Sequence, residues 1–347
     1  MTVLGQIPVE ELGITQMHEH LLIQADSIWH KPSEGFLQKL VRERVKQSNL
    51  WLLWRNDAAS KDNLRLDDVD LAAEEVSKYE RLGGRTLVEV TPTNLHRDPK
   101  GMQTISKKSN VHVICGCAYY LEHTLSDRIR QRSTKSITSE FVHEITQGIS
   151  NTGVKPGIIG EIGTSSPITK TEKKMLRAAA QAHVQTGVPI DVHLSHPRRE
   201  GNRVLDILEA EGVDARRVAL SHLDQVLTPE ALDDHESLVE RGAYVMYDDF
   251  GEEYYLQQWS QPGRLSTVLL PRDIERADAI SRLIDRDCLE KIMLSSDISQ
   301  KIQLEHYGGF GYHHILRDTV PMLRAKGITE KEIHTMLVEN PCRFFSS

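Results

Sequence analysis

Two histidines separated by one residue, in Met17-His18-Glu19-His20, have the types and spacing needed for metal chemistry. In an extended chain, side chains two positions apart project from the same face. His18 and His20 can therefore hold one metal ion together, while Glu19 points the other way. Such a pair also occurs as ordinary hydrogen-bonded histidines, so the metal hypothesis depends on what else converges on it.

Four more residues of ligand type stand where apolar runs end. They are Glu161, His193, His222 and Asp297. A single histidine in such a place is more often structural than functional. Six ligand-type residues at equivalent ends of a repeating unit are harder to attribute to chance, so together they predict a metal site.

Six imidazole and carboxylate ligands exceed the three or four that one zinc ion usually takes from a protein, so the set predicts two divalent cations. Zinc is favoured, with manganese, cobalt or iron as alternatives. Two cations about 3.5–4 Å apart can share a water whose pKa falls towards 7, and the resulting hydroxide is a nucleophile. Asp297 can orient this hydroxide and accept its proton as the catalytic base. The pattern therefore predicts a binuclear hydrolase.

These residues can meet only if their strands end at a common rim. Eight apolar or β-branched runs alternate with amphipathic helical stretches, and they cover residues 13–17, 85–90, 111–118, 157–161, 188–192, 218–221, 243–247 and 292–295. This alternation predicts an α/β fold of the TIM (β/α)8 barrel type, in which the carboxyl ends of all strands face one side. An open doubly wound sheet is the alternative, but the glycine-rich dinucleotide fingerprint is missing.

The helices between the strands carry end signals. Residues 68–82 are followed by a Gly-Gly pair, which is typical of a helix C-terminus. Residues 171–186 are expected to form a helix capped at its N-terminus by Thr171, with acidic charge in the first turn.

Two regions depart from the repeat. Residues 31–63 form an insertion after the first strand that contains an apolar run at 50–54, and we expect helical packing over the barrel end, with a lid or a dimer contact as alternatives. Residues 248–271 are expected to form a long loop in which Tyr254 lines a pocket or fills it. Nothing resembling a linker divides the chain, which predicts a single domain over residues 1–347.

The composition narrows the function classes. Of 347 residues, 39% are hydrophobic, and the formal net charge of −8 argues against a general nucleic-acid binder. We find neither a run of about 20 apolar residues nor a secretory signal, so no membrane association is expected. Four cysteines are too few for a disulfide scaffold in a chain of this length and favour reduced thiols in a cytoplasmic protein.

The sequence resembles the phosphotriesterase family of the amidohydrolase superfamily, in its phosphotriesterase-related, resiniferatoxin-binding branch. The resemblance rests on residues 13–20, 157–163, 296–297, 308–316 and 338–341, together with the two single-histidine strand ends. It implies a TIM barrel and a homodimer. It also implies the following ligands: His18, His20 and Asp297 at the buried metal, His193 and His222 at the exposed one, and Glu161 as the bridge, where the best-known members carry a carboxylated lysine.

The resemblance also bears on the substrate. Family lactonases tend to show an Asp-Arg-aromatic-Gly motif after the seventh strand, whereas residues 248–251 read Asp-Asp-Phe-Gly, which argues against a lactone. Tyr120 matches an aromatic position that lines the family's pocket. Arg198 and Arg199 lie just beyond His193 and can receive an anionic substrate group, although a solvated charge pair is an equal interpretation.

These observations predict hydrolysis of a carboxylic ester, lactone or amide of a small molecule, with phosphotriesterase activity as a possible side reaction. One alternative is a protein that retains the metal site and binds a small ligand without turnover. A mononuclear iron oxygenase is a further alternative, but such enzymes use two histidines and one carboxylate rather than six ligands.

Overall fold

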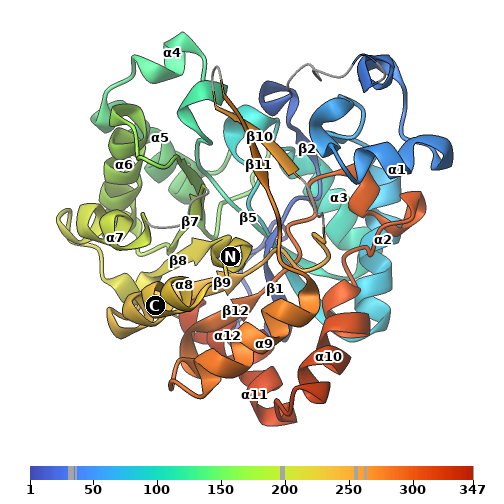
Figure 1. Cartoon of the computed structure of the whole chain (residues 1–347). Helices are drawn as coiled ribbons and strands as arrows, with labels where there is room; N and C mark the ends of the chain where they lie inside the picture. The colour runs from blue at the N-terminus through green and yellow to red at the C-terminus, as the bar shows by residue number, and fades with distance from the viewer. Residues whose placement is uncertain (30–34, 36, 196–199, 254–256, 262–263, 347) are drawn as a thin grey trace.

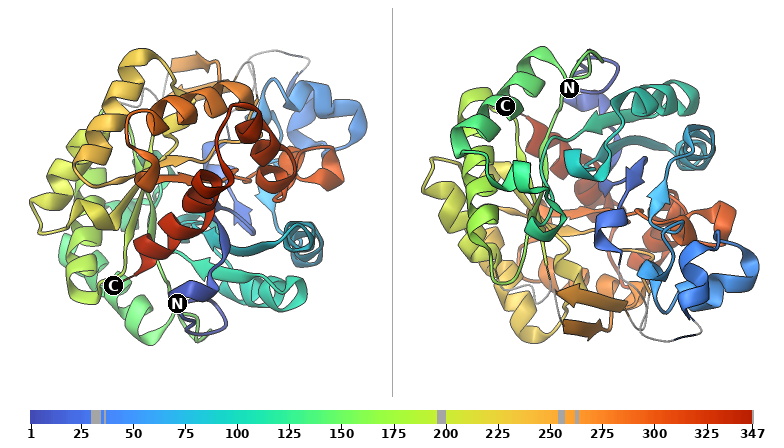
Figure 2. Two further views of the ribbon diagram at one scale, coloured as in Figure 1. Left: turned by 90° about the horizontal axis from the view of Figure 1, so that it is seen from below. Right: turned by 90° about the horizontal axis from the view of Figure 1, so that it is seen from above.

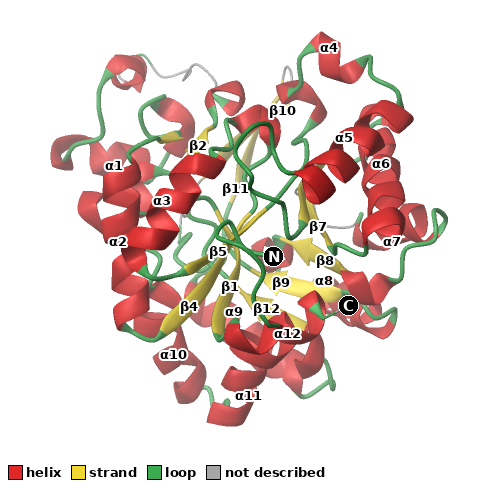
Figure 3. Ribbon diagram, turned by 180° about the vertical axis from the view of Figure 1, so that it is seen from behind, coloured by secondary structure: helices red, strands yellow, loops and turns green. Residues whose placement is uncertain are grey.

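The structure is a computed structural model that describes residues 1–29, 35, 37–195, 200–253, 257–261 and 264–346. Strands occupy the centre of the molecule and helices surround them, as the view from behind shows most clearly (Figure 3). The chain colours run around this ring in sequence order in the cartoon of Figure 1. Strands and helices therefore alternate in sequence, as their hydrophobic pattern predicts.

Eight parallel strands form two ladders. The first ladder has the order β1-β4-β5 and the second has the order β12-β9-β8-β7-β6. The strands are β1 (Ile14–Glu19), β4 (Gly84–Glu89), β5 (His112–Cys115), β6 (Ile159–Thr164), β7 (Ile190–Leu194), β8 (Val218–Ser221), β9 (Tyr244–Tyr247) and β12 (Ile292–Leu294). Each overlaps one of the eight predicted strands.

Hydrogen bonds across the two seams join these ladders into a ring. Between β5 and β6, the amide of Gly157 donates to the carbonyl of Cys115 over 2.9 Å. Between β12 and β1, the amide of His18 donates to Ser295 Oγ over 3.0 Å, and the amide of Asp297 donates to the carbonyl of His18 over 3.3 Å. The fold is thus a TIM barrel, and the second seam lies directly at two predicted metal ligands.

The barrel interior is filled by apolar side chains. One buried cluster takes a residue from each of six strands, and these residues are Met17, Val88, Ile114, Ala219, Met246 and Met293. Side chains from strands all around the ring can meet only inside it. Phe344 of α12 (Asn340–Phe345) belongs to the same cluster, so the last helix packs against one end of the interior.

Helices cover the outside of the ring, as the two end-on views show (Figure 2). They are α2 (Val69–Arg81), α3 (Pro99–Ser109), α4 (Asp127–Arg130), α5 (Thr134–Gln147), α6 (Lys170–Thr186), α7 (Gly201–Glu209), α8 (Pro229–Glu240), α9 (Asp273–Ile284), α10 (Val320–Ala325) and α11 (Glu330–His334). The apolar faces of α5 to α9 and the outward faces of β6 to β9 and β12 belong to one large buried cluster, whereas α2 and α3 pack with β4 and β5 in a second one.

The N-cap predicted for α6 was wrong by two residues. The capping residue is Thr169, whose Oγ accepts from the amide of Glu172 over 3.1 Å, while Glu172 Oε2 accepts from the amide of Thr169 over 2.9 Å. This reciprocal capping box needs an acidic residue three positions after the cap. Thr171 lacks that partner, whereas Thr169 has it.

The insertion of residues 31–63 is helical only in short pieces. Its described part contains a 3₁₀ turn at Leu37–Arg42, another at Gln47–Asn49, the single turn α1 (Leu50–Leu53) and a third 3₁₀ turn at Asp57–Ala59. Buried Leu53 packs with Leu270 and Ile302, which come from the far end of the chain. The hydrophobic run of the insertion therefore packs against the loops around the last strands.

The long loop expected over residues 248–271 is partly a hairpin. Strands β10 (Gln257–Gln261) and β11 (Arg264–Val268) pair antiparallel, with Gln257 opposite Val268. A smaller antiparallel pair joins β2 (Ile23–Gln24) to β3 (Arg65–Leu66). Neither pair carries the long apolar run from which the barrel strands were predicted.

Candidate metal centre

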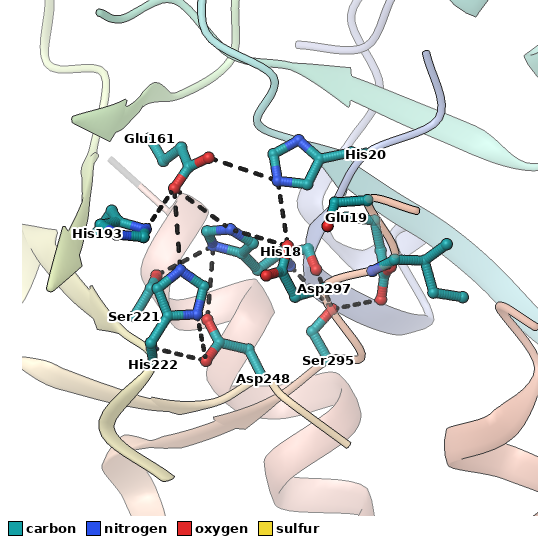
Figure 4. A network of polar contacts seen from close by, with 12 residues as sticks. His18, Glu19, His20, Glu161, His193, Ser221, His222, Asp248, Ser295 and Asp297 are labelled. Atoms are coloured by element: carbon teal, nitrogen blue, oxygen red, sulfur yellow. Dashed lines mark hydrogen bonds and ion pairs between the residues drawn. The ribbon is translucent and has the colours of Figure 1, made fainter. Parts of the chain in front are cut away.

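Glu161 faces all four predicted histidine ligands, as the dashed contacts show (Figure 4). Its Oε1 is 3.4 Å from Nε2 of His20. Its Oε2 is 3.0 Å from Nδ1 of His193, 3.7 Å from Nε2 of His18 and 3.9 Å from Nε2 of His222. Residues from β1, β6 and β7, and those just after β1 and β8, therefore converge on one carboxylate.

Asp297 completes the set from the loop after β12. Its Oδ1 lies 3.1 Å from Nε2 of His20 and 3.7 Å from Nε2 of His18. The structure thus brings all six predicted residues together, although their positions in the sequence range from 18 to 297.

Two of the six have backbone conformations that side chains rarely adopt. The φ angle is 64° at His222 and 45° at Asp297. Such conformations cost on the order of 1–3 kcal/mol and persist only where the surroundings fix them. His222 directly follows β8 and turns its side chain towards Glu161, and Asp297, three residues after the end of β12, turns its side chain towards His18 and His20.

Three buried atoms that face one another have no hydrogen-bond partner among the described residues. They are His18 Nε2, Glu161 Oε2 and Asp297 Oδ1. Leaving a buried polar atom unsatisfied costs roughly 1–3 kcal/mol, so several together require an explanation. Imidazole nitrogen and carboxylate oxygen are the donors that zinc and related cations prefer. The three atoms therefore fit a divalent cation.

The electrostatics favour a cation at this point. Burial opposes ionisation of Glu161, but the adjacent imidazoles of His193, His222 and His18 outweigh it and hold the pKa of Glu161 well below its usual range. Burial lowers the pKa of His18, yet the hydrogen bond and charge of Asp191 raise it to about 10. Without a metal, the positive charge of protonated imidazoles thus balances the negative charge of the surrounding carboxylates.

Polar neighbours orient the rings of the first histidine pair. The Nδ1 of His20 lies 2.8 Å from Oγ1 of Thr91, which donates to Glu89 over 2.6 Å. The Nδ1 of His18 lies 3.1 Å from Oγ of Ser221 and 3.2 Å from Oδ2 of Asp191. Each ring therefore presents Nε2 to Glu161, the usual way in which a metal-binding histidine is oriented.

The sequence analysis missed Asp191, Asp248 and Asp249. Asp248 Oδ1 accepts from the amide of His222 over 2.7 Å, and Asp249 Oδ1 lies 3.2 Å from Nδ1 of His222. Asp191 lies two positions before His193 inside a buried strand, where a charged residue needs a reason. Asp248 directly follows β9, so the strand-end rule that found the other ligands applies to it as well.

Of the four residues predicted to contact substrate, the structure describes only Tyr120. The hydroxyl of Tyr120 is 3.4 Å from both ring nitrogens of His193, and Tyr120 lines the pocket beside the metal site. Arg198, Arg199 and Tyr254 lie outside the described residues. Substrate contact at all four positions stays a prediction.

A pocket opens directly onto five of the six residues, namely His20, Glu161, His193, His222 and Asp297. Its described wall carries apolar side chains and a few polar ones, namely Ile23, Ala25, Ile28, Ala58, Leu64, Leu95, Leu121, Asp57, His123, Gln225, Glu252, Ser299 and Gln300. Asp57 and Ala58 come from the insertion, which therefore forms part of the wall. Concave, largely apolar sites with a few convergent polar groups are typical of small-molecule binding.

A family model described as the phosphotriesterase family matches residues 1–345. The chain belongs to the phosphotriesterase family. Enzymes of this family are metal-dependent, and this chain is a hydrolase of the phosphotriesterase type. None of the helices among the described residues is long and apolar enough to cross a membrane.

Curated relatives in the phosphotriesterase family match over almost their whole length. An N-acetyltaurine hydrolase of Danio rerio is 34% identical and is covered over 97% of its length by 99% of this chain. The N-acetyltaurine hydrolase of Homo sapiens is also 34% identical, with coverage of 95% and 98%. A phosphotriesterase-related protein of Nematostella vectensis is likewise 34% identical, with coverage of 96% and 98%.

Solved structures of the family agree with this fold. The crystal structure of a resiniferatoxin-binding protein from Rhodobacter sphaeroides is 37% identical, with a TM-score of 0.94 over 100% of this chain and 94% of that one. A phosphotriesterase homology protein from Escherichia coli, complexed with phosphate in its active site, is 30% identical, with a TM-score of 0.77 over 97% and 99%.

Proposed function

We propose that this phosphotriesterase-family chain is a binuclear metal-dependent hydrolase of small N-acyl amides or carboxylic esters. The observation that carries the proposal is the convergence of four imidazoles and Asp297 on Glu161, with three buried atoms left unsatisfied between them. The relatives named N-acetyltaurine hydrolase favour an amide among these substrates.

In this proposal, His18, His20 and Asp297 would hold one cation, His193 and His222 would hold the other, and Glu161 would be shared by the two. Two divalent cations bound there would lower the pKa of the attacking water and polarise the scissile carbonyl. A pair accounts for the number of ligands better than a single ion, because one zinc ion takes three or four protein ligands.

Asp297 is the proton acceptor in this scheme. Its side chain is 16% exposed and Asp297 lines the pocket, whereas the side chain of Glu161 is 3% exposed and has histidine nitrogens around it. A water beside the cations can therefore reach Asp297, which takes the proton as the nucleophile attacks and returns it to the leaving amine or alcohol.

The pocket wall gives the substrate its orientation. Ile23, Leu95 and Leu121 offer an apolar surface that suits a short acyl group and excludes water from it. The hydroxyl of Tyr120 lies beside His193 and can donate to the substrate carbonyl. The more polar leaving group then faces Gln225, Ser299 and Gln300.

Metal content and a substrate panel test the proposal. Protein prepared without chelators is analysed for transition metals and assayed against N-acyl amides, carboxylic esters, lactones and a phosphotriester. We expect two divalent cations per chain and the highest kcat/KM on an amide or ester, with lactones weaker because residues 248–251 lack the arginine. Protein without bound metal that nevertheless hydrolyses these substrates would contradict the metal mechanism.

A second candidate function is ligand binding without turnover. It is favoured by the structure of the resiniferatoxin-binding protein, which is 37% identical and matches the whole chain. The two functions differ in one result. A metal-loaded protein that binds a small apolar ligand but turns over no member of the panel supports the binder and contradicts the hydrolase.

A further inference from the structure

A single buried arginine of α9 lies behind the metal centre, among the carboxylates that support it. Arg276 is completely buried. Its Nε lies 2.9 Å from Oδ2 of Asp224, and its Nη1 donates to Oδ1 of Asp273 over 3.0 Å. Its Nη2 donates to the carbonyl oxygen of Glu252 over 3.2 Å. The three arms of the guanidinium thus contact the loop after β8, the loop after β9 and α9 itself.

The contact of Arg276 with Asp224 connects the arginine, through Asp249, to the predicted metal ligand His222. Oδ2 of Asp224, the atom that Arg276 contacts, also accepts from the amide of Asp249 over 3.1 Å. Oδ1 of Asp249 is 3.2 Å from Nδ1 of His222, the ring nitrogen on the side away from Glu161. Asp224 therefore connects Arg276 to Asp249, whose carboxylate lies against the His222 ring.

The second arm fixes the same loop from behind. Asp273 Oδ1 accepts from the amide of Gly251 over 2.9 Å as well as from Arg276. Its other oxygen contacts Nε2 of His314, which belongs to the motif at residues 308–316, and Nδ1 of His314 lies 2.8 Å from Asp318. The loop after β9 is thus held at Asp249, Gly251 and Glu252 by groups that meet at Arg276.

The other histidine pair is oriented mainly by different residues. His20 uses Thr91 and Glu89, and His18 uses Asp191 and Ser221, while Asp248 of the loop after β9 lies farther from His18, with Oδ2 3.5 Å from its Nδ1. In the part of the chain that the structure describes, Arg276 contacts Asp224, Asp273 and Glu252, and none of Thr91, Glu89, Asp191 and Ser221. Its removal should therefore disturb one side of the metal centre more than the other.

Resting on the proposed function, we propose that Arg276 is a positioning residue for the cation site of His193 and His222. It fixes Asp224 and the loop after β9, so that Asp249 holds the His222 ring with Nε2 towards Glu161. Lysine cannot replace it fully, because one ammonium cannot reach Asp224, Asp273 and the Glu252 carbonyl in the same fixed geometry. Supports of this kind typically change metal affinity by about 10–100-fold.

Zinc titration of the metal-stripped full chain tests the assignment. Calorimetry is run on the wild type, on Arg276→Met and Arg276→Lys, and on Arg282→Met as the matched control, since Arg282 is an exposed arginine of the same helix. We expect Arg276→Met to weaken one of two zinc sites about 10–100-fold and to leave the other within about threefold. Arg276→Lys should fall between, and Arg282→Met should match the wild type.

Three results overturn the role. Wild-type affinity at both sites in Arg276→Met would show that the arginine positions neither. An equal loss at both sites, together with a lower unfolding temperature of the metal-free protein, would show a purely structural role. A wild type that binds fewer than two zinc ions would overturn the binuclear proposal and this inference with it, so the two failures are distinguishable.

A second variant keeps the test valid if Arg276→Met does not fold. Asp273→Asn preserves the shape of the side chain but removes the charge that pairs with Arg276 and His314. We expect the same asymmetric loss of zinc affinity, smaller in size, because Arg276 keeps its contact with Asp224. Symmetric loss or no loss in Asp273→Asn would count against the positioning role.

Discussion

At the scale of single residues, Glu161 has the most distinctive place, because the proposed bridging residue is a glutamate, whereas the family resemblance implies a carboxylated lysine there in the best-known members. Both groups present one negative charge, but glutamate has it without any added carbon dioxide. The low pKa of Glu161, which the adjacent imidazoles of His193 and His222 lower against the effect of burial, keeps its carboxylate ionised across the physiological range. Assembly of the metal centre should therefore depend on the metal alone.

This predicts that metal loading is insensitive to bicarbonate. Metal-stripped protein is reloaded with zinc in buffer freed of carbon dioxide and in the same buffer with added bicarbonate, and activity and bound zinc are followed over time. The two time courses should coincide. Glu161→Lys is the comparison, since any recovery in that variant should require bicarbonate. A bicarbonate requirement in the wild type would contradict a glutamate bridge.

Asp297 carries the second prediction at this scale. Asp297→Asn keeps the size of the side chain but removes its ability to accept a proton. General base catalysis typically contributes about 10²–10⁴-fold, so kcat at saturating metal should fall by about that factor. Asp214→Asn changes an exposed carboxylate that is distant from Asp297 in the sequence. It is the control and should keep wild-type kcat. A kcat within threefold of the wild type in Asp297→Asn would exclude Asp297 as the base.

At the scale of elements, the barrel strands were predictable because they are buried on both faces and therefore form apolar runs. The hairpin of β10 and β11 was not predictable from such runs, because Gln257–Gln261 is mostly polar. The cap of α6 was missed because two threonines compete there, and only the position of Glu172 three residues after Thr169 decides between them.

The α6 cap therefore gives a paired prediction. Thr169→Ala removes the hydroxyl that accepts from the Glu172 amide and should lower the free energy of unfolding by about 1 kcal/mol. Thr171→Ala removes a hydroxyl that donates to Glu122 at the half-buried edge of the helix, and it should lower the free energy of unfolding by less. Urea unfolding of both variants measures the difference. A larger loss of unfolding free energy in Thr171→Ala than in Thr169→Ala would show that Thr171 is the capping residue.

The contact between α8 and β9 predicts a pH dependence of stability. His235 of α8 is buried with Nδ1 3.2 Å from the hydroxyl of Tyr247, and burial lowers the pKa of His235 to about 4. The unfolded chain takes up this proton near pH 6.5, so the contribution to stability is complete above that pH and is lost as the pH falls towards 4.

His235→Gln isolates this contribution, because glutamine keeps a polar partner for Tyr247 and does not titrate. Between pH 7.5 and pH 5 the wild type should lose about 2 kcal/mol more of its free energy of unfolding than the variant does. Urea unfolding at a series of pH values measures both curves. Parallel curves for the two proteins would contradict a buried neutral imidazole at His235.

At the scale of the whole molecule, the candidate ligands come from strands on both sides of the two seams. His18 and His20 belong to the first ladder, Glu161 and His193 to the second, and Asp297 lies at the seam between β12 and β1. The sequence analysis could place each ligand at a strand end, because that follows from the repeat. It could not find the seam bonds or Arg276, because these depend on distances between residues far apart in sequence.

This arrangement predicts that bound metal acts as a link across the barrel and stabilises the whole fold. A ligand that binds only the native state stabilises it by about 2.7 kcal/mol when its free concentration is one hundred times its dissociation constant. The unfolding temperature should therefore rise continuously with the logarithm of buffered free zinc, and chelation should lower it by several degrees. Asp297→Asn, which lacks one ligand at the seam, should respond less steeply. An unfolding temperature that does not change with free zinc would mean that these residues do not form a metal site in the native protein, since native-state binding must shift the equilibrium.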